Sequence, residues 1–263
     1  MAAKRFDSDN SFISQTVERA CHSVDDDPGC SQRRARRARH QPTGSLNGMR
    51  INVGCGQTPT PGWNNFDNSP SVRLAQLPPL LVQWLVRLSL INRGQHDFIT
   101  FCRSRHILHA NALALPLADG QVAVLYSCHM LEHLDHRAAV LFLREARRLL
   151  KPGGIIRLVV PDLEKMVLDY TRHRDGNAFL EQTLLLCADP RTFREKAAFL
   201  LSGHRGHKYL YDAQSLCRLL TEEGFVDPRP LPPGITTIPD PGQLNLHERA
   251  EESLFVEATA PAS

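Results

Sequence analysis

The sequence predicts an α/β fold in which helices cover both faces of a mostly parallel sheet. β-forming runs alternate with segments of helical periodicity from residue 50 to 160, the order typical of a parallel sheet between helices. Residues 122–127 and 155–160 are continuous apolar runs, as in strands buried on both faces. With 263 residues, 42% of them hydrophobic, the chain can form one sizeable domain plus extensions.

The first predicted strand, residues 50–53, runs directly into Gly54-Cys55-Gly56. Glycine has no Cβ, so a chain that turns sharply out of a buried strand can bring its backbone close to a ligand. In nucleotide-binding α/β sheets this turn lies where the strand order switches. Asp67 ends a second short strand, 13 residues after Gly54. A carboxylate there can accept hydrogen bonds from both hydroxyls of a ribose.

The spacing of the glycines indicates which kind of nucleotide cofactor the turn could bind. A dinucleotide-binding turn has G-x-G-x-x-G, whose third glycine lets the helix pack closely beside a pyrophosphate. The third position here is Pro59, which disfavours an oxidoreductase that uses NAD. The remaining G-x-G also occurs in tight turns that bind no ligand.

Charge and cysteine content narrow the class of protein. A net charge of +3 is too small to argue for nucleic-acid binding. The seven cysteines are scattered, odd in number and without a C-x-x-C pair, which disfavours a disulfide framework and a zinc site. No apolar stretch follows the first basic residues, so we expect no secretory leader. These features predict reduced thiols and a cytoplasmic location.

Residues 1–48 differ from the rest because they are polar and contain an arginine run at residues 33–39. Such a segment buries too little apolar surface to offset its ordering entropy, so we predict a disordered basic tail. The arginine run is a candidate contact for nucleic acid or an acidic membrane surface. A solvated tail or short surface helix is the simpler interpretation.

Residues 74–91 form a long apolar segment. A bilayer-spanning helix needs about 20 nearly uninterrupted apolar residues, whereas Pro78, Pro79, Gln83 and Arg87 interrupt this one. We therefore expect no transmembrane segment. The segment is predicted to be a helix beside the site, a substrate lid or a homodimer contact, and an apolar face on a membrane surface is a weaker alternative.

The remaining helices are predicted from periodicity and end signals. A helix over 137–150 stops at the Lys-Pro-Gly-Gly of 151–154. Residues 163–205 have helical character and are expected to cover the site. Asp212 offers an N-cap to a helix that Gly224 closes.

The remaining strands are shorter. Residues 107–112, 225–226 and 253–258 are predicted strands. Residues 228–241 contain six prolines and are predicted to be a loop, because proline is hard to place in a sheet.

Six motifs, in this order and spacing, resemble the class I S-adenosylmethionine-dependent methyltransferases, specifically the type 11 group of small-molecule enzymes. They are Ile51-Asn52-Val53-Gly54-Cys55-Gly56, Phe66-Asp67, Asn111-Ala112 with Leu115-Pro116, Tyr126-Ser127 with Leu131-Glu132-His133-Leu134, Leu150-Lys151-Pro152-Gly153-Gly154, and Glu222-Glu223-Gly224-Phe225. The resemblance implies a Rossmann-like doubly wound sheet of seven strands, mostly parallel with an antiparallel last strand. It also implies a domain over residues 49–260, with an insert at 71–105 and a helical cap at 163–210.

The resemblance implies S-adenosylmethionine as cofactor. The glycine loop would pass under its methionine portion and ribose, Asp67 would bind the ribose hydroxyls, and Asn111 would meet the adenine amino group. The family usually has an acid where Asn111 stands and often one where Asn52 stands, so these contacts are neutral here instead of charge-assisted. The implied cofactor-binding residues are Asn52, Val53, Gly54, Cys55, Gly56, Asp67, Asn68, Asn111, Ala112 and Ser127.

Three histidines are candidate catalytic bases. The sulfonium carries an activated methyl group, so the protein must position and deprotonate a nucleophile, and histidine suits that task near neutral pH. His129, His133 and His207 are the candidates, although each has a structural alternative such as capping or packing a helix start. Glu132 is expected to be structural, holding a loop by backbone hydrogen bonds. No histidine or carboxylate spacing on one element supports a metal site strongly, so we expect none. A metal is a weaker alternative, because His129 and His133 are four positions apart.

The favoured function is methyl transfer to a small-molecule or sugar-like acceptor. A cofactor-binding interaction module without turnover is a second hypothesis, motivated by the asparagines at customary acidic positions. A nucleic-acid methyltransferase that uses the arginine-rich tail is a third. Nucleic acid is disfavoured as a partner because the chain has no Asn/Asp-Pro-Pro-aromatic motif.

Overall fold

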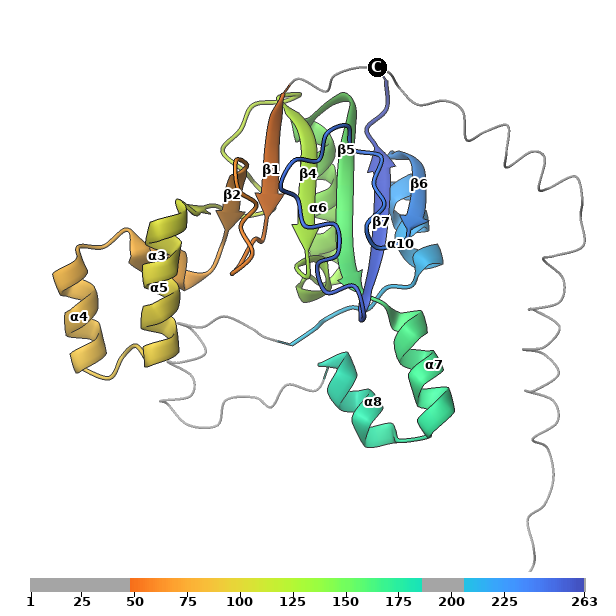
Figure 1. Ribbon diagram of the computed structural model, residues 1–263. Helices are drawn as coiled ribbons and strands as arrows, with labels where there is room; N and C mark the ends of the chain where they lie inside the picture. The colour runs from red at the N-terminus through yellow and green to blue at the C-terminus, as the bar shows by residue number, and fades with distance from the viewer. Residues whose placement is uncertain (1–47, 186–205, 263) are drawn as a thin grey trace, which may run out of the picture. The chain divides into compact units, whose positions relative to one another are not determined.

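The structure is a computed structural model that describes residues 48–185 and 206–262. The predicted basic tail, apart from Gly48, lies outside these residues, as does the part of the predicted cap from 186 to 205. The described residues form a sheet with its flanking helices (Figure 1).

The sheet has seven strands in the order β3-β2-β1-β4-β5-β7-β6. Strands β1 to β5 pair in parallel, whereas β7 is antiparallel to both of its neighbours. The predicted fold class is therefore confirmed, including the antiparallel last strand. The strands are β1 (Met49–Val53), β2 (Asn64–Asp67), β3 (Leu108–His109), β4 (Val122–Cys128), β5 (Leu150–Pro161), β6 (Val226–Leu231) and β7 (Ser253–Thr259).

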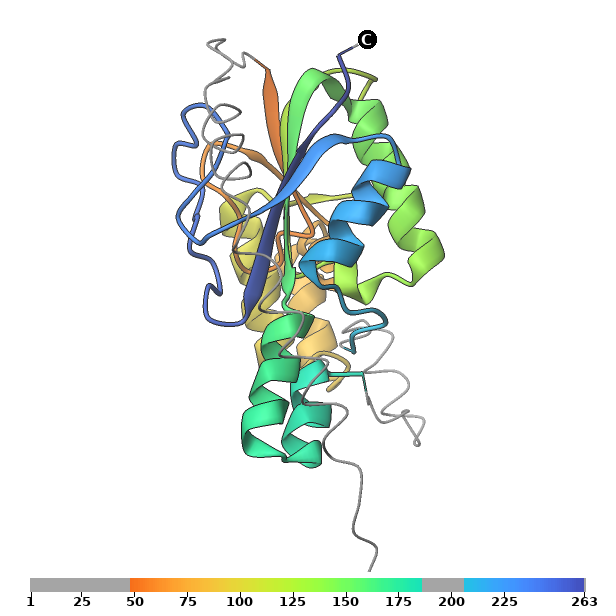
Figure 2. The same cartoon turned by 90° about the vertical axis from the view of Figure 1, so that its right-hand side faces the viewer.

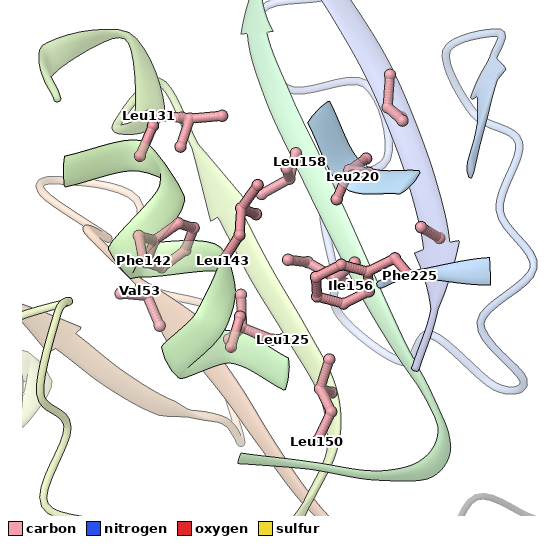
Figure 3. Close-up of a cluster of buried hydrophobic side chains, with 14 of the residues drawn as sticks. Val53, Leu125, Leu131, Phe142, Leu143, Leu150, Ile156, Leu158, Leu220 and Phe225 are labelled. Carbon is pink, nitrogen blue, oxygen red and sulfur yellow. The ribbon is translucent and has the colours of Figure 1, made fainter. Parts of the chain in front are cut away.

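One face of the sheet is covered by α6 (His136–Leu149) and α10 (Ala213–Glu222). Phe142 and Leu143 of α6 lie over the central strands (Figure 3) and are fully buried. Each such side chain stabilises the fold by about 1.5–3 kcal/mol as an upper estimate. Asp135 begins α6 by accepting a hydrogen bond from the Ala138 amide at 2.8 Å. The predicted helix over 137–150 is confirmed.

The opposite face over β4 and β5 is covered by a loop from the carboxyl-terminal part of the chain. Ile238 and Leu244 of this loop pack with Val124 and Tyr126 of β4. Figure 2 shows the sheet edge-on, with α6 and α10 on one side and the loop on the other. The core of the sheet is thus closed on both sides.

The insert after β2 contains α3 (Pro70–Ala75), α4 (Pro79–Arg87) and α5 (Arg93–Arg105). The helix expected over 74–91 is shorter than predicted, because the proline pair interrupts it and α4 begins with Pro79 at its first turn. Helix α5 was not predicted; Asn92 caps it by accepting from the Gln95 amide. No helix in the described part of the chain is long and apolar enough to cross a bilayer.

The proline-rich segment shows where the sequence-based expectation was wrong. Pro228 and Pro230 lie within β6, at the edge of the sheet, instead of in a loop. An edge strand tolerates proline because only one side of it bonds a neighbour. The pairing shifts register between Val226 and Arg229, where Asp227 has φ +51°. The described part of the predicted cap is helical, as α7 (Leu163–His173) and α8 (Gly176–Thr183).

Candidate active site

A cavity of about 440 Å³ lies at the carboxyl ends of β1, β2 and β3, and we call it the loop cavity. Six of the ten predicted cofactor residues line it, which are Val53, Gly54, Asp67, Asn68, Asn111 and Ala112. The other four are Asn52, Cys55, Gly56 and Ser127. Met130, His133 and Leu134 complete one wall of the cavity.

Asp67 holds the two sides of this cavity together. Its Oδ2 accepts a hydrogen bond from the Gly56 amide at 3.0 Å, and its Oδ1 accepts one from the Ser69 amide at 2.7 Å. The carboxylate therefore ties the glycine loop to the start of α3. A carboxylate offers about four acceptor positions, so further hydroxyl groups can still bind to it.

We expected both glycines of the loop to leave space for a ligand, but only one of them does. Gly54 has φ +72°, and a Cβ built there would lie 2.7 Å from Cβ of Met130. The protein's own methionine therefore occupies the room that Gly54 leaves. Gly56 has φ +48° and open space around its missing Cβ, so the expected free approach exists at Gly56 alone.

Three predicted cofactor residues direct their side chains into the protein. The Asn52 amide nitrogen donates to the Thr58 carbonyl and to Thr60 Oγ1, each at 3.1 Å. Ser127 Oγ donates to the Val53 carbonyl at 2.9 Å. Cys55 is buried, and this burial raises the pKa of its thiol far above the ordinary value. These side chains support the loop, and their contact with a cofactor stays a prediction.

Asn111 stands at the rim of the loop cavity and is exposed. Its Oδ1 accepts a hydrogen bond from the Leu113 amide at 3.1 Å, which orients the side chain. The amide oxygen has a second lone pair, so it can still accept from a ligand.

A second cavity of about 290 Å³ lies beside the end of β4, and we call it the histidine cavity. It is lined by His129, Glu132, His133, Pro161, Met166, Gln182, Leu184, His207, Arg249 and Glu252. All three predicted catalytic histidines are therefore brought together. His133 lines both cavities, so the two spaces adjoin at this residue.

The histidine rings surround Glu132. His129 Nδ1 lies 3.4 Å and His207 Nε2 lies 3.9 Å from Glu132 Oε1. His129 Nε2 is 2.8 Å from Ser253 Oγ, and His129 itself has φ +49°. The rings of His133 and His207 meet edge to face at 5.2 Å. Burial lowers the pKa of His207, although the Glu132 charge opposes this shift.

Glu132 is only 1% exposed. The expected backbone hydrogen bonds are made by its carbonyl oxygen, which accepts from the Lys208 and Tyr209 amides at 2.7 and 3.2 Å. Within the described residues, neither carboxylate oxygen has a hydrogen-bond partner. The side chain thus faces the histidines and does not hold a loop.

Sequence reasoning did not find Met130, Gln182, Arg249 or Glu252 as cavity residues. The last three come from α8 and from the loop before β7, far from Glu132 in the sequence. No local pattern marks them, because only the packing of these segments brings them to the end of β4. Met130 lay inside a recognised motif, but its contact with Gly54 depends on the β1–β4 pairing.

Residues 91–158 match the methyltransferase domain family. This segment runs from the insert through β4 and α6 into β5, and the strand order places it in a seven-stranded sheet with an antiparallel β7. The chain is therefore similar to the methyltransferases over this segment, and its sheet has the Rossmann-like methyltransferase fold. S-adenosylmethionine is therefore the cofactor of this methyltransferase.

Solved structures of S-adenosylmethionine-dependent methyltransferases are similar to the chain. One from Thermotoga maritima has 17% identity and a TM-score of 0.44, covering 81% of this chain and 83% of that one. One from Methanosarcina mazei has 17% identity and a TM-score of 0.46, covering 84% and 95%. One from Archaeoglobus fulgidus has 14% identity and a TM-score of 0.43, covering 95% and 100%. No curated protein matches the methyltransferase.

Proposed function

We propose that the methyltransferase acts on a small-molecule or sugar-like acceptor that binds in the histidine cavity while the cofactor binds in the loop cavity. The observation that carries this proposal is the junction of the two cavities at His133. Two reactants that bind in adjoining spaces are held for an in-line reaction, and such positioning contributes about 7–11 kcal/mol in favourable cases.

The loop cavity suits the cofactor in size and chemistry. Its volume of about 440 Å³ lies within the range of roughly 300–1,000 Å³ for small-molecule sites. The Asp67 carboxylate would bind the ribose hydroxyls, and Asn111 with the Ala112 amide would meet the adenine. S-adenosylmethionine supplies a methyl group that its sulfonium already activates. The chain's own residues must then orient the acceptor and remove its proton.

His129 is the residue that we propose as general base. Glu132 Oε1 lies 3.4 Å from its Nδ1, so a proton on Nδ1 is stabilised and Nε2 can accept one. Nε2 is hydrogen-bonded to Ser253 Oγ at 2.8 Å. An acceptor hydroxyl would replace Ser253 as the partner of Nε2. A positioned base contributes about 10²–10⁴-fold in rate.

Thermal unfolding with S-adenosylhomocysteine tests the cofactor site. Ligand at a hundred times its dissociation constant adds about 2.7 kcal/mol to the folded state, or roughly 5–10 °C at this chain length. Asp67→Ala should abolish most of the rise, whereas the control Asp97→Ala, whose side chain is 80% exposed, should keep it. A rise with NADH in place of S-adenosylhomocysteine would overturn the assignment.

Labelled methyl transfer tests turnover. The full chain is incubated with methyl-labelled S-adenosylmethionine and a small-molecule fraction of cell extract, and we expect label in that fraction. His129→Gln should reduce transfer about 10²–10⁴-fold while the thermal response to S-adenosylhomocysteine is kept. Cofactor binding without transfer to any acceptor would support an inactive binding module instead.

Three further features belong to the proposal. The methyltransferase domain spans residues 49–260, with an insert at 71–105 and a cap at 163–210. The protein works in the cytoplasm, where thiols such as Cys55 and Cys102 stay reduced.

The α4 segment forms a homodimer contact, since Leu80 is 74% and Trp84 63% exposed. Light scattering should find a dimer that Trp84→Glu dissociates.

A further inference from the structure

Among the described residues, the buried carboxylate of Glu132 has no hydrogen-bond donor and no lysine or arginine paired with it, and the ring nitrogens of His129 and His207 lie 3.4 and 3.9 Å from its Oε1. Glu132 is 1% exposed, and within the described residues neither oxygen accepts a hydrogen bond. Burying an ionised carboxylate without a partner is strongly unfavourable, so native proteins supply a proton or a cation. Among the residues that the structure describes, Arg249 is the one lysine or arginine that lines the histidine cavity, and it pairs instead with Glu252 at 2.6 Å.

Two histidine rings are oriented so that a nitrogen lone pair is free. His133 Nδ1 lies 3.0 Å from the Gly206 carbonyl oxygen, and His207 Nδ1 lies 2.8 Å from that of Thr183. A carbonyl only accepts, so each Nδ1 carries a proton, and in the neutral ring each Nε2 is then an unprotonated acceptor. Metal-binding histidines are held in this way, with the second ring nitrogen donating to a carbonyl or carboxylate.

The three groups are close enough to share one ion. One ligand atom from each of Glu132, His133 and His207 lies within 4.8 Å of the other two. A tetrahedral zinc ion with bonds of about 2.0–2.1 Å has ligand atoms roughly 3.3 Å apart. The 3.9 Å between Glu132 Oε1 and His207 Nε2 needs only a small side-chain adjustment to reach this value.

We propose that Glu132, His133 and His207 form a binding site for one divalent transition-metal ion. Two imidazoles and one carboxylate suit Zn²⁺ or Fe²⁺ and leave positions open to another ligand. Within the described residues this is the one cluster of histidine, cysteine and acidic groups with such spacing. The proposal goes beyond the sequence pattern, since His207 lies 75 positions after Glu132.

The site indicates an acceptor that binds through an oxygen. A hydroxyl bound to such an ion would ionise far more readily than a free one. All three proposed ligands line the histidine cavity, which shares His133 with the loop cavity. His129 stays outside the ligand set and can take the proton. This role of the ion rests on the proposed function, whereas metal binding does not.

Metal binding is tested on the full chain, purified without a histidine tag and stripped with a chelator. Titration with Co²⁺, followed by its visible absorption, should show one ion per chain, and Zn²⁺ should displace it. Glu132→Gln and His207→Gln should each weaken binding at least 10-fold. His173→Gln, on an exposed side chain of α7, is the matched control and should bind normally.

Circular dichroism and the response to S-adenosylhomocysteine control for folding. If Glu132→Gln does not fold, His133→Gln and His207→Gln provide the same comparison. Absence of saturable Co²⁺ binding, or unchanged affinity in folded ligand variants, would refute the metal site. A normal response to S-adenosylhomocysteine in that case would leave the proposed function standing. If the chain bound the metal but did not respond to S-adenosylhomocysteine, the metal site would stand and the proposed function would be refuted.

Discussion

The buried ion pair between Arg157 of β5 and Glu257 of β7 provides the most quantitative test of the fold. Arg157 is 0% and Glu257 1% exposed, and Arg157 Nη1 lies 2.6 Å from Glu257 Oε1. The guanidinium also donates to the Ile235 carbonyl at 2.9 Å and lies 5.1 Å from the Phe255 ring centroid. Glu257 accepts from the hydroxyls of Thr236 and Thr237. The pair thus joins two strands and the covering loop.

Arg157→Met keeps an unbranched side chain but removes the positive charge. Glu257 would stay buried with hydrogen bonds and no counter-charge, which costs about 3–5 kcal/mol. At about 2–4 °C per kcal/mol for a chain of this size, the thermal midpoint should fall by roughly 6–20 °C. Replacing both partners should recover part of the loss, but not the bonds from the loop threonines.

Urea unfolding followed by circular dichroism measures this cost. Arg218→Met is the matched control, because Arg218 is 68% exposed and its nearest carboxylate oxygen, on Glu222, is 4.0 Å away. Such a surface pair contributes roughly 0–1 kcal/mol. If Arg157→Met lost no more stability than Arg218→Met, the reasoning about the buried charge would be refuted.

Three further predictions concern single residues. Gly54→Ala should destabilise the fold by about 1–3 kcal/mol, because its φ of +72° is strained for alanine and Met130 fills the space; an unchanged thermal midpoint would contradict this. Asp212→Ala should cost about 1 kcal/mol, since Asp212 Oδ1 accepts from the Ser215 amide at 2.7 Å. That hydrogen bond lowers the folded-state pKa of Asp212 below its ordinary 3.8. The stabilisation by the Asp212 carboxylate is therefore fully present above pH 3.8 and is lost as the pH falls through the lowered pKa. The difference in urea midpoint between the wild type and Asp212→Ala should accordingly shrink in acid. Cys55 should resist iodoacetamide in the folded protein and react in urea, because burial keeps its thiol protonated; rapid labelling found by mass spectrometry would argue against this burial.

Local residue patterns were sufficient to predict the elements that carry the methyltransferase motifs. The strands that end at Val53 and Cys128, the helix capped by Asp135 and the strand before Asp162 all depend on neighbours in the sequence. Hydrophobic periodicity and capping act within a few residues, so one chain reveals them. The hydrogen bond between Asp67 and the glycine loop depends in addition on the parallel pairing of β1 with β2.

Contacts between distant segments could not be predicted in this way. Glu132, His133 and His207 meet because residues 206–211 return to the end of β4, and Arg157 finds Glu257 because β7 pairs with β5 in one register. Pro228 fits a strand only because β6 lies at the sheet edge. Each of these contacts depends on which segments pack together. The packing follows from the burial of side chains over the whole chain, so a short stretch of sequence does not predict it.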